Sequence, residues 1–171
     1  MRICFVGDSF VNGTGDPECL GWVGRVSAAA RKRGVDLTCY NLGVRRETSD
    51  DIRRRWGAEV ARRLPPEYPS GLVFSFGVND TTVDGAARRV PLEASLRNAH
   101  QALSEARRLH PTLMVGPAPV ADDDQNARIA DLSARLAGVC RELEVPCLEV
   151  FDHLVGSGVW VEEARVSDGA H

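Results

Sequence analysis

The amino-acid sequence predicts an α/β fold built on a central parallel sheet of five strands. Five short apolar runs alternate with four segments in which apolar residues recur at helical spacing. Strands that alternate with helices form parallel βαβ units, and helices cover both faces of such a sheet. With 171 residues, 43% of them hydrophobic, the chain is long enough for one domain with a proper core and short for two.

The expected strands are short and apolar, as strands buried on both faces are. The first ends directly at a Gly-Asp-Ser triplet, and the fourth is followed by a Gly-Pro-Ala-Pro segment. In chain order, the five expected strands are Arg2–Val6, Val35–Asn41, Leu72–Phe76, Leu113–Val115 and Pro146–Val150.

The expected helices lie between these strands, and each presents one apolar face. Residues Ile52, Trp56 and Val60, for example, stand four apart. Residues that stop helices follow three of the four segments, namely Gly34, Pro65 and Pro111. The four expected helices cover residues 23–34, 52–64, 92–106 and 129–143.

Composition excludes several classes of protein. The net charge of −3 and the lack of a basic stripe argue against a nucleic-acid partner. The five cysteines are an odd number with no CxxC pair, which favours free thiols and a reducing compartment. No apolar run has the ~18 residues of a membrane span, and the chain enters a strand pattern at Arg2 without a signal peptide. We therefore expect a cytoplasmic protein without a membrane span, and no residue pattern calls for a cofactor or a metal.

Polar motifs follow three of the expected strands directly. Gly7-Asp8-Ser9 follows the first strand, Asn41-Leu42-Gly43 closes the second, and Gly77-Val78-Asn79-Asp80 follows the third. Ligands of open parallel sheets bind beyond the carboxyl ends of the strands. A fourth motif, Asp168-Gly169-Ala170-His171, ends the chain. We expect all four motifs at one edge of the sheet.

These residue types suit nucleophilic catalysis by a serine. A serine hydroxyl needs a base within hydrogen-bond reach, and the base needs a group that orients it. Asp168 and His171 are three residues apart, so one turn can place their side chains together. The oxyanion needs fixed donors, which the Ser9 N–H and the Asn79 amide can supply, and a glycine at residue 43 permits close approach of the backbone.

In their order along the chain, the four motifs resemble the four blocks of the GDSL (SGNH) hydrolases. The resemblance covers residues 7–171 and implies a flavodoxin-like three-layer α/β/α sandwich, formed by a single domain over residues 1–171. It implies a catalytic triad of Ser9, Asp168 and His171 and an oxyanion hole made by Ser9, Gly43 and Asn79. The activity it implies is hydrolysis of carboxylic (acyl) esters of small molecules, as an esterase or lipase, through an acyl-Ser9 intermediate.

The sequence departs from this family in two places. Many members carry a second glycine three residues after the oxyanion glycine, whereas this chain has Arg46. Relatives also continue past the histidine with a proline and a C-terminal helix, which we expect to be absent from this chain. The residues that we expect to contact substrate flank the motifs: Asp8, Asn12, Arg45, Arg46 and Asp80.

Other functions and sites remain as alternatives. Acyl transfer would use the same triad with an alcohol or amine in place of water. A flavodoxin-like phosphate- or nucleotide-binding module would use the Gly7–Gly15 loop, which lacks the glycine-rich phosphate motifs. An ordinary α/β-hydrolase is disfavoured because no GxSxG occurs. Within the triad, His153 is the alternative to His171 as the base.

Two charged clusters are interpreted as helix features. Asp122–Asp124 precede a helix, where negative charge suits the helix dipole. The second cluster suits a solvated helix face, and it consists of Asp50, Asp51, Arg54, Arg55 and Glu59.

Overall fold

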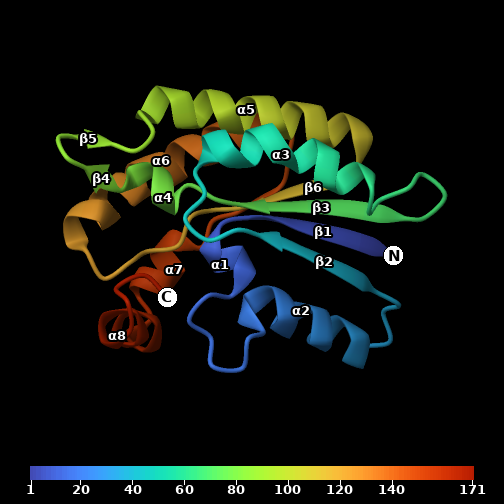
Figure 1. Cartoon of the computed structure of the whole chain (residues 1–171), viewed down its shortest axis with the longest axis horizontal. Coiled ribbons are helices and arrows are strands. Elements are labelled where there is room, and N and C mark those ends of the chain that lie inside the picture. The colour runs from blue at the N-terminus through green and yellow to red at the C-terminus, as the bar shows by residue number, and fades with distance from the viewer.

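The computed structural model describes all residues from Met1 to His171 and confirms the predicted parallel sheet. Its five strands lie in the order β2-β1-β3-β6-β7, the order of a flavodoxin-like sheet. They are β1 (Arg2–Gly7), β2 (Thr38–Gly43), β3 (Ser70–Ser75), β6 (Thr112–Val115) and β7 (Cys147–Leu148). Figure 1 shows the sheet between layers of helices.

The four predicted long helices are all present. They are α2 (Gly21–Lys32), α3 (Ser49–Ala61), α5 (Leu92–Leu109) and α6 (Asp123–Glu142). Their ends follow local chemistry: α2 stops at Gly34, where φ is +82°. The side chain of Asp122 caps α6 by accepting the Gln125 N–H at 2.6 Å. Asp51 closes a capping box with Thr48 at the start of α3.

The main core lies between one face of the sheet and the helices α3, α5 and α6 (Figure 1). Alternate strand residues point into it, and among the largest fully buried side chains are Trp56 of α3 and Phe74 of β3, whose ring centroids are 5.5 Å apart. On the opposite face, Phe5 packs with Val23 of α2. That face is less completely covered, because Ile3 and Val73 remain half-buried.

Several short elements were not predicted. They are α1 (Ser9–Asn12), α4 (Val78–Thr81), the hairpin β4 (Val83–Asp84) with β5 (Ala87–Arg88), α7 (Phe151–Val155) and α8 (Gly158–Val166). All but α8 have five residues or fewer, too few for apolar periodicity to reveal them, and the nine residues of α8 include only one buried residue, Ala164. The second strand begins at Thr38 rather than Val35, because its partner strand begins at Arg2 and Thr38 is the residue paired with it. None of the helices combines the length and the apolar composition of a membrane span.

Candidate active site

The carboxyl ends of β1 and β3 bring the first and third motifs together, as the parallel topology requires. Gly7 closes β1, and Ser9 begins α1 directly after it. Gly7 must be a glycine, since a Cβ there would lie 2.0 Å from the Ser75 carbonyl oxygen on β3. Ser9 is buried, and it lines a cavity of about 470 Å³ together with Asn79, the second residue of α4.

The C-terminal motif closes the same cavity, which Asp168 and His171 also line. His171 Nδ1 lies 2.9 Å from Oδ2 of Asp168, and the His171 N–H donates to Oδ1 at 3.0 Å. The Nε2 atom of His171 is buried and has no hydrogen-bond partner. The ring is therefore oriented by Asp168 through one nitrogen, and the other nitrogen is free to accept a proton.

Ser9 and His171 are not hydrogen-bonded to each other in this structure. Catalytic hydrogen bonds are often long without substrate and tighten in the substrate complex. The rival base, His153, lies exposed on α7 and does not line the cavity that holds Ser9. Of the two histidines, only His171 shares a cavity with the serine.

The Asp168 carboxylate is poised to stay ionised. Partial burial alone would raise its pKa, but hydrogen bonds from the His171 ring, the His171 N–H and the Ala170 N–H lower the pKa to about 2. Arg45 adds a cation on the solvent side, with Nη2 at 3.3 Å from Asp168 Oδ2. A charged carboxylate beside the imidazole is what stabilises an imidazolium during proton transfer.

Asn79 also lines the cavity, and the loop after β2 holds its side chain in place. Its Nδ2 donates to the Glu47 carbonyl oxygen at 2.9 Å and makes a longer contact of 3.4 Å with Asp8 Oδ2. An amide nitrogen carries two hydrogens. The second hydrogen makes only the long bond to Asp8, which a substrate oxygen would have to replace.

Gly43, expected to be an oxyanion donor, does not line the cavity that holds Ser9. Its N–H already donates to Asn41 Oδ1 at 2.9 Å. A Cβ at residue 43 would lie 2.1 Å from the Asn12 nitrogen, so the glycine permits α1 to pack against the end of β2. Three residues later, Arg46 has a φ of +71°, a conformation that favours glycine, and its N–H makes no hydrogen bond within the chain.

The structure corrects several expected substrate contacts. Asp8 is buried and accepts the Phe10 N–H at 3.0 Å, and burial is the main reason why its pKa rises to about 7. Asp80 is also buried and accepts the Ser49 N–H at 2.8 Å, so it anchors α3 instead of facing substrate. Burial raises the pKa of Asp80 as well.

Asn12 and Arg45 line an open hollow beside the α1–α2 loop, whereas Arg46 does not line the cavity that holds Ser9. Asn12 is committed to local bonds, because it donates to the Gly43 carbonyl oxygen at 3.4 Å and accepts from Thr14. The Asp8 carboxylate occupies the N-terminus of α1. This arrangement argues against the phosphate-loop alternative, since a phosphate would meet a carboxylate there.

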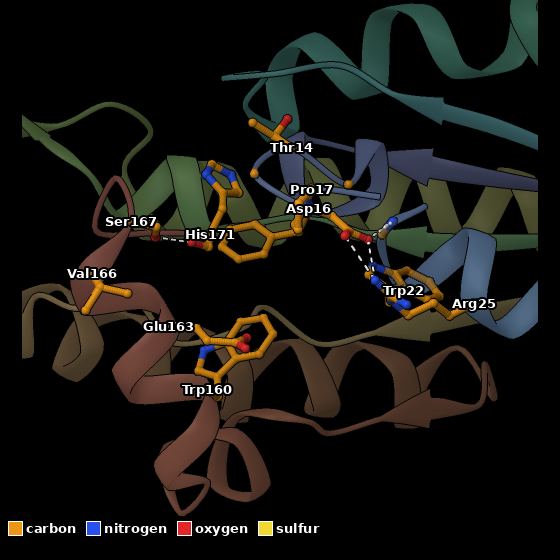
Figure 2. Close-up of a pocket in the computed structure, with 14 residues that line it drawn as sticks. Thr14, Asp16, Pro17, Trp22, Arg25, Trp160, Glu163, Val166, Ser167 and His171 are labelled. Carbon is orange, nitrogen blue, oxygen red and sulfur yellow. Dashed lines mark hydrogen bonds and ion pairs between the residues drawn. The ribbon is translucent and has the colours of Figure 1, made fainter. Parts of the chain in front are cut away.

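A second and larger cavity, of about 580 Å³, adjoins the first at Phe10 and His171. The Phe10 ring lies 4.9 Å from the His171 ring and 6.2 Å from that of Trp160 on α8, measured between centroids. Figure 2 shows Trp160 and His171 towards one end of this cavity, and Trp22 with Arg25 at the other. The two cavities offer space on both sides of Phe10 for the two halves of a substrate.

The charged face of α3 contains a residue whose environment the sequence did not reveal. Arg55 is not solvated but only 18% exposed, and its guanidinium donates to the carbonyl oxygens of Leu42 and Gly7 at 2.8 and 3.1 Å. It also binds the carboxylates of Glu47 and Glu59, at 2.6 and 2.9 Å. The spacing of four residues between Arg55 and Glu59 indicates their ion pair. It does not indicate the hydrogen bonds from Arg55 to the carbonyl oxygens at the ends of β1 and β2.

Comparison with known proteins gives a family match over most of the chain. The model of the GDSL-like Lipase/Acylhydrolase family matches residues 5–171. A search of curated proteins found no match.

Solved structures share the fold at low sequence identity. A lipase/acylhydrolase from Enterococcus faecalis is 18% identical with a TM-score of 0.72, over 93% of this chain and 80% of that one. An acetylxylan esterase from Geobacillus stearothermophilus is 16% identical with a TM-score of 0.75, over 88% and 76%. An esterase of the SGNH-hydrolase family is 20% identical with a TM-score of 0.73, over 92% and 79%.

Proposed function

The chain belongs to the GDSL-like lipase/acylhydrolase family and is a carboxylic ester hydrolase, and from that premise we propose that it cleaves esters through an acyl-Ser9 intermediate. One observation carries the proposal. Ser9, Asn79 and a histidine oriented by a carboxylate line a single cavity. A nucleophile, its base and an oxyanion donor are the parts that acyl transfer requires.

In the proposed reaction, Ser9 Oγ attacks the ester carbonyl carbon while His171 Nε2 takes the hydroxyl proton. Asp168 stabilises the imidazolium that results. The tetrahedral intermediate collapses to the acyl-enzyme, and His171 returns the proton to the departing alcohol. Water then attacks the acyl carbon with the same base, and Ser9 is regenerated with release of the carboxylic acid.

The oxyanion forms beside the Ser9 N–H and the Asn79 amide, both of which can donate to it. For the third donor we choose the Arg46 N–H over the Gly43 N–H. The Gly43 N–H is already donated to Asn41, whereas the Arg46 N–H is unpartnered. Arg46 is not among the residues that line the cavity with Ser9, but Asn79, which lines it, binds the carbonyl of Glu47, the residue after Arg46, and so holds this loop beside the cavity. Fixed donors that need no reorganisation are the most effective stabilisers of such a charge.

The substrate is a small-molecule ester whose two parts occupy the two cavities that adjoin at Phe10. The loop of residues 10–22 lines the larger one, and residues 120–122 line the smaller one with Ser9. The aromatic rings of Phe10, Trp22 and Trp160 line the larger cavity, and the charged residues Asp16, Arg25 and Glu163 also line it, with Asp16 and Arg25 paired to each other. We therefore expect it to take an apolar or ring-containing group rather than a compact charged one.

The deciding experiment compares the wild type with Ser9→Ala on p-nitrophenyl esters of increasing chain length. We expect turnover to be lost in Ser9→Ala by several orders of magnitude, ~10⁶ in a comparable hydrolase. A fluorophosphonate probe should label Ser9 stoichiometrically in the wild type. Labelling at another residue, or turnover that survives in Ser9→Ala, would overturn the proposal. Adding competing alcohols to the same assay separates hydrolysis from acyl transfer, because transfer yields a new ester.

A further inference from the structure

Arg55 is the one cation that contacts the carboxyl ends of both β1 and β2. Its Nη2 donates to the carbonyl oxygens of Gly7 and Leu42, the last residue of β1 and the next-to-last of β2. Gly7 stands two residues before the nucleophile. The Val44 N–H donates to the same Gly7 carbonyl at 3.0 Å, so the guanidinium and the loop after β2 meet on one oxygen.

The same guanidinium also holds the segment that positions Asn79. Arg55 Nε lies 2.6 Å from Glu47 Oε2, and the Glu47 backbone carbonyl accepts the Asn79 amide at 2.9 Å. One side chain therefore reaches Asn79 through a single intervening residue. Glu47 itself is only 17% exposed, so without Arg55 its carboxylate would be left poorly solvated and unpaired.

The chemistry of the guanidinium suits this task. It is planar and always charged, and it presents five donors in a fixed fork, so it can bind two carboxylates and two carbonyls at once. A lysine ammonium has three donors on a flexible stem. Arg55 is directed away from solvent and contacts backbone oxygens, which distinguishes it from Arg54, whose side chain is 65% exposed and pairs only with Asp51.

We propose that Arg55 is a positioning residue for the ester hydrolysis proposed above, holding the Ser9 N–H and the Asn79 amide where the oxyanion forms. It touches no substrate. It fixes the Gly7 carbonyl behind the nucleophile and the Glu47 segment behind Asn79. A displacement of about 1 Å at a reacting group can cost ~10²-fold in rate. The loss should fall on kcat, because these donors act on charge that develops in the transition state.

The first test compares Arg55→Met and Arg55→Lys with Arg54→Met, the same change at the neighbouring position of α3. We expect kcat to fall ~10²-fold in Arg55→Met and by a smaller factor in Arg55→Lys, with KM nearly unchanged. Arg54→Met should behave as wild type. Equal kcat for Arg55→Met and wild type would overturn the inference. If Arg55→Met does not fold, Arg55→Lys alone decides, and a wild-type kcat in it counts against the proposal.

A double-mutant cycle separates positioning from general stabilisation. If Arg55 acts largely through Asn79, Arg55→Met should cost far less in an Asn79→Ala background, under ~10-fold, than in the wild type. A purely structural role predicts the same loss in both backgrounds. Chemical rescue gives a second measure: free guanidinium at low concentration should restore kcat in Arg55→Ala, and ammonium should not. Full additivity together with absence of rescue would refute the role.

These results also distinguish failure of this inference from failure of the proposed function. Ser9→Ala is measured in the same assay. If Ser9→Ala keeps its turnover, the esterase mechanism is wrong, and the role of Arg55 goes with it. If turnover depends on Ser9 while Arg55→Met retains the wild-type kcat, only the positioning role is wrong.

Discussion

Gly15 lies against His171 so closely that a Cβ added at residue 15 would stand 2.8 Å from the His171 Cβ. The contact comes from the α1–α2 loop, and φ at Gly15 is +87°. The proposed base is therefore packed against the backbone at Gly15. A glycine outside the four sequence motifs therefore limits where the histidine can lie.

Gly15→Ala should displace His171 and lower kcat, by ~10²-fold for a shift of about 1 Å. Gly34→Ala is the matched control. Gly34 has a φ of +82°, almost the same, but no heavy atom lies within 4 Å of a Cβ built there. Both variants should lose a similar stability of about 1–2 kcal/mol from left-handed strain. Ester assays and thermal unfolding of the two variants check this, and equal kcat values would show that the contact with His171 is unimportant.

Asp8→Asn should change how the stability of the protein depends on pH. The pKa of Asp8 is about 7 in the folded state, raised mainly by burial, against an ordinary value of 3.8. Between these values the unfolded chain has lost the proton while the folded protein keeps it. The stability of the wild type should therefore fall as pH rises from about 4 to about 7, and level off above that. Asp8→Asn should lack this fall, so its stability relative to wild type should grow over the same window.

Denaturant unfolding of the wild type and Asp8→Asn across this pH range measures the effect. Asp84→Asn, at an exposed site on β4, is the control and should follow the wild-type curve. If the wild type and Asp8→Asn run parallel from acid to neutral pH, Asp8 is ionised in the folded protein. The 3.4 Å contact with Asn79 would then join an amide to a carboxylate ion.

The fold and the order of the motifs were predictable because both rest on local patterns. Apolar runs and helical spacing located every strand of the sheet and every long helix. The strand-end rule then brought Ser9 and Asn79 to one edge, where both line one cavity. The spacing of three residues between Asp168 and His171 likewise indicated that their side chains would meet.

The parts that were missed depend on how distant segments pack. Arg55 has acidic neighbours at helical spacing, which is equally typical of a solvated face, and only the position of α3 over the sheet brings it to Leu42. No sequence pattern indicates that the Asn41 side chain accepts the Gly43 N–H, because that contact depends on how the end of β2 is bent. The burial of Asp80 under α3 also depends on tertiary packing, because an Asn-Asp pair reads the same in the sequence whether it is exposed or buried.

Arg45→Gln should reduce kcat only modestly. The side chains of Arg45 and Asp168 are 61% and 43% exposed, and exposed ion pairs contribute ~0.2–1 kcal/mol, which is at most about fivefold in rate. The loss should shrink further at high salt, which screens such pairs. Initial rates at low and high ionic strength check this. A large, salt-independent loss would instead show that Arg45 contacts the substrate.

Asn79→Ala should lower kcat by ~10²–10³-fold with little change in KM, as loss of one oxyanion donor does. Asn79→Asp is the closest variant in shape, but it replaces the donor by a carboxylate that repels the oxyanion, so it should be at least as impaired. Steady-state kinetics of both variants measure the effect. A raised KM at an unchanged kcat would make Asn79 a substrate-binding residue and leave the oxyanion to the backbone donors.

The last prediction separates the roles of Gly43 and Arg46 through stability. Gly43→Ala would place a Cβ 2.1 Å from the Asn12 backbone nitrogen, so α1 would have to move, at a cost of about 1–3 kcal/mol or more. Gly57→Ala in α3 is the control, because nothing lies within 4 Å and alanine favours a helix by ~1 kcal/mol.

Arg46→Gly should do the opposite of Gly43→Ala. It relieves the left-handed strain at a φ of +71° and keeps the N–H that we assign to the oxyanion hole. The relief of strain is partly offset, because glycine loses more conformational entropy on folding. We therefore expect Arg46→Gly to be more stable than the wild type by no more than about 1 kcal/mol. Turnover should be retained because a backbone donor does not depend on the side chain. Denaturant unfolding and kcat of all three variants test this, and a loss of kcat in Arg46→Gly with stability intact would mean that the Arg46 side chain itself takes part.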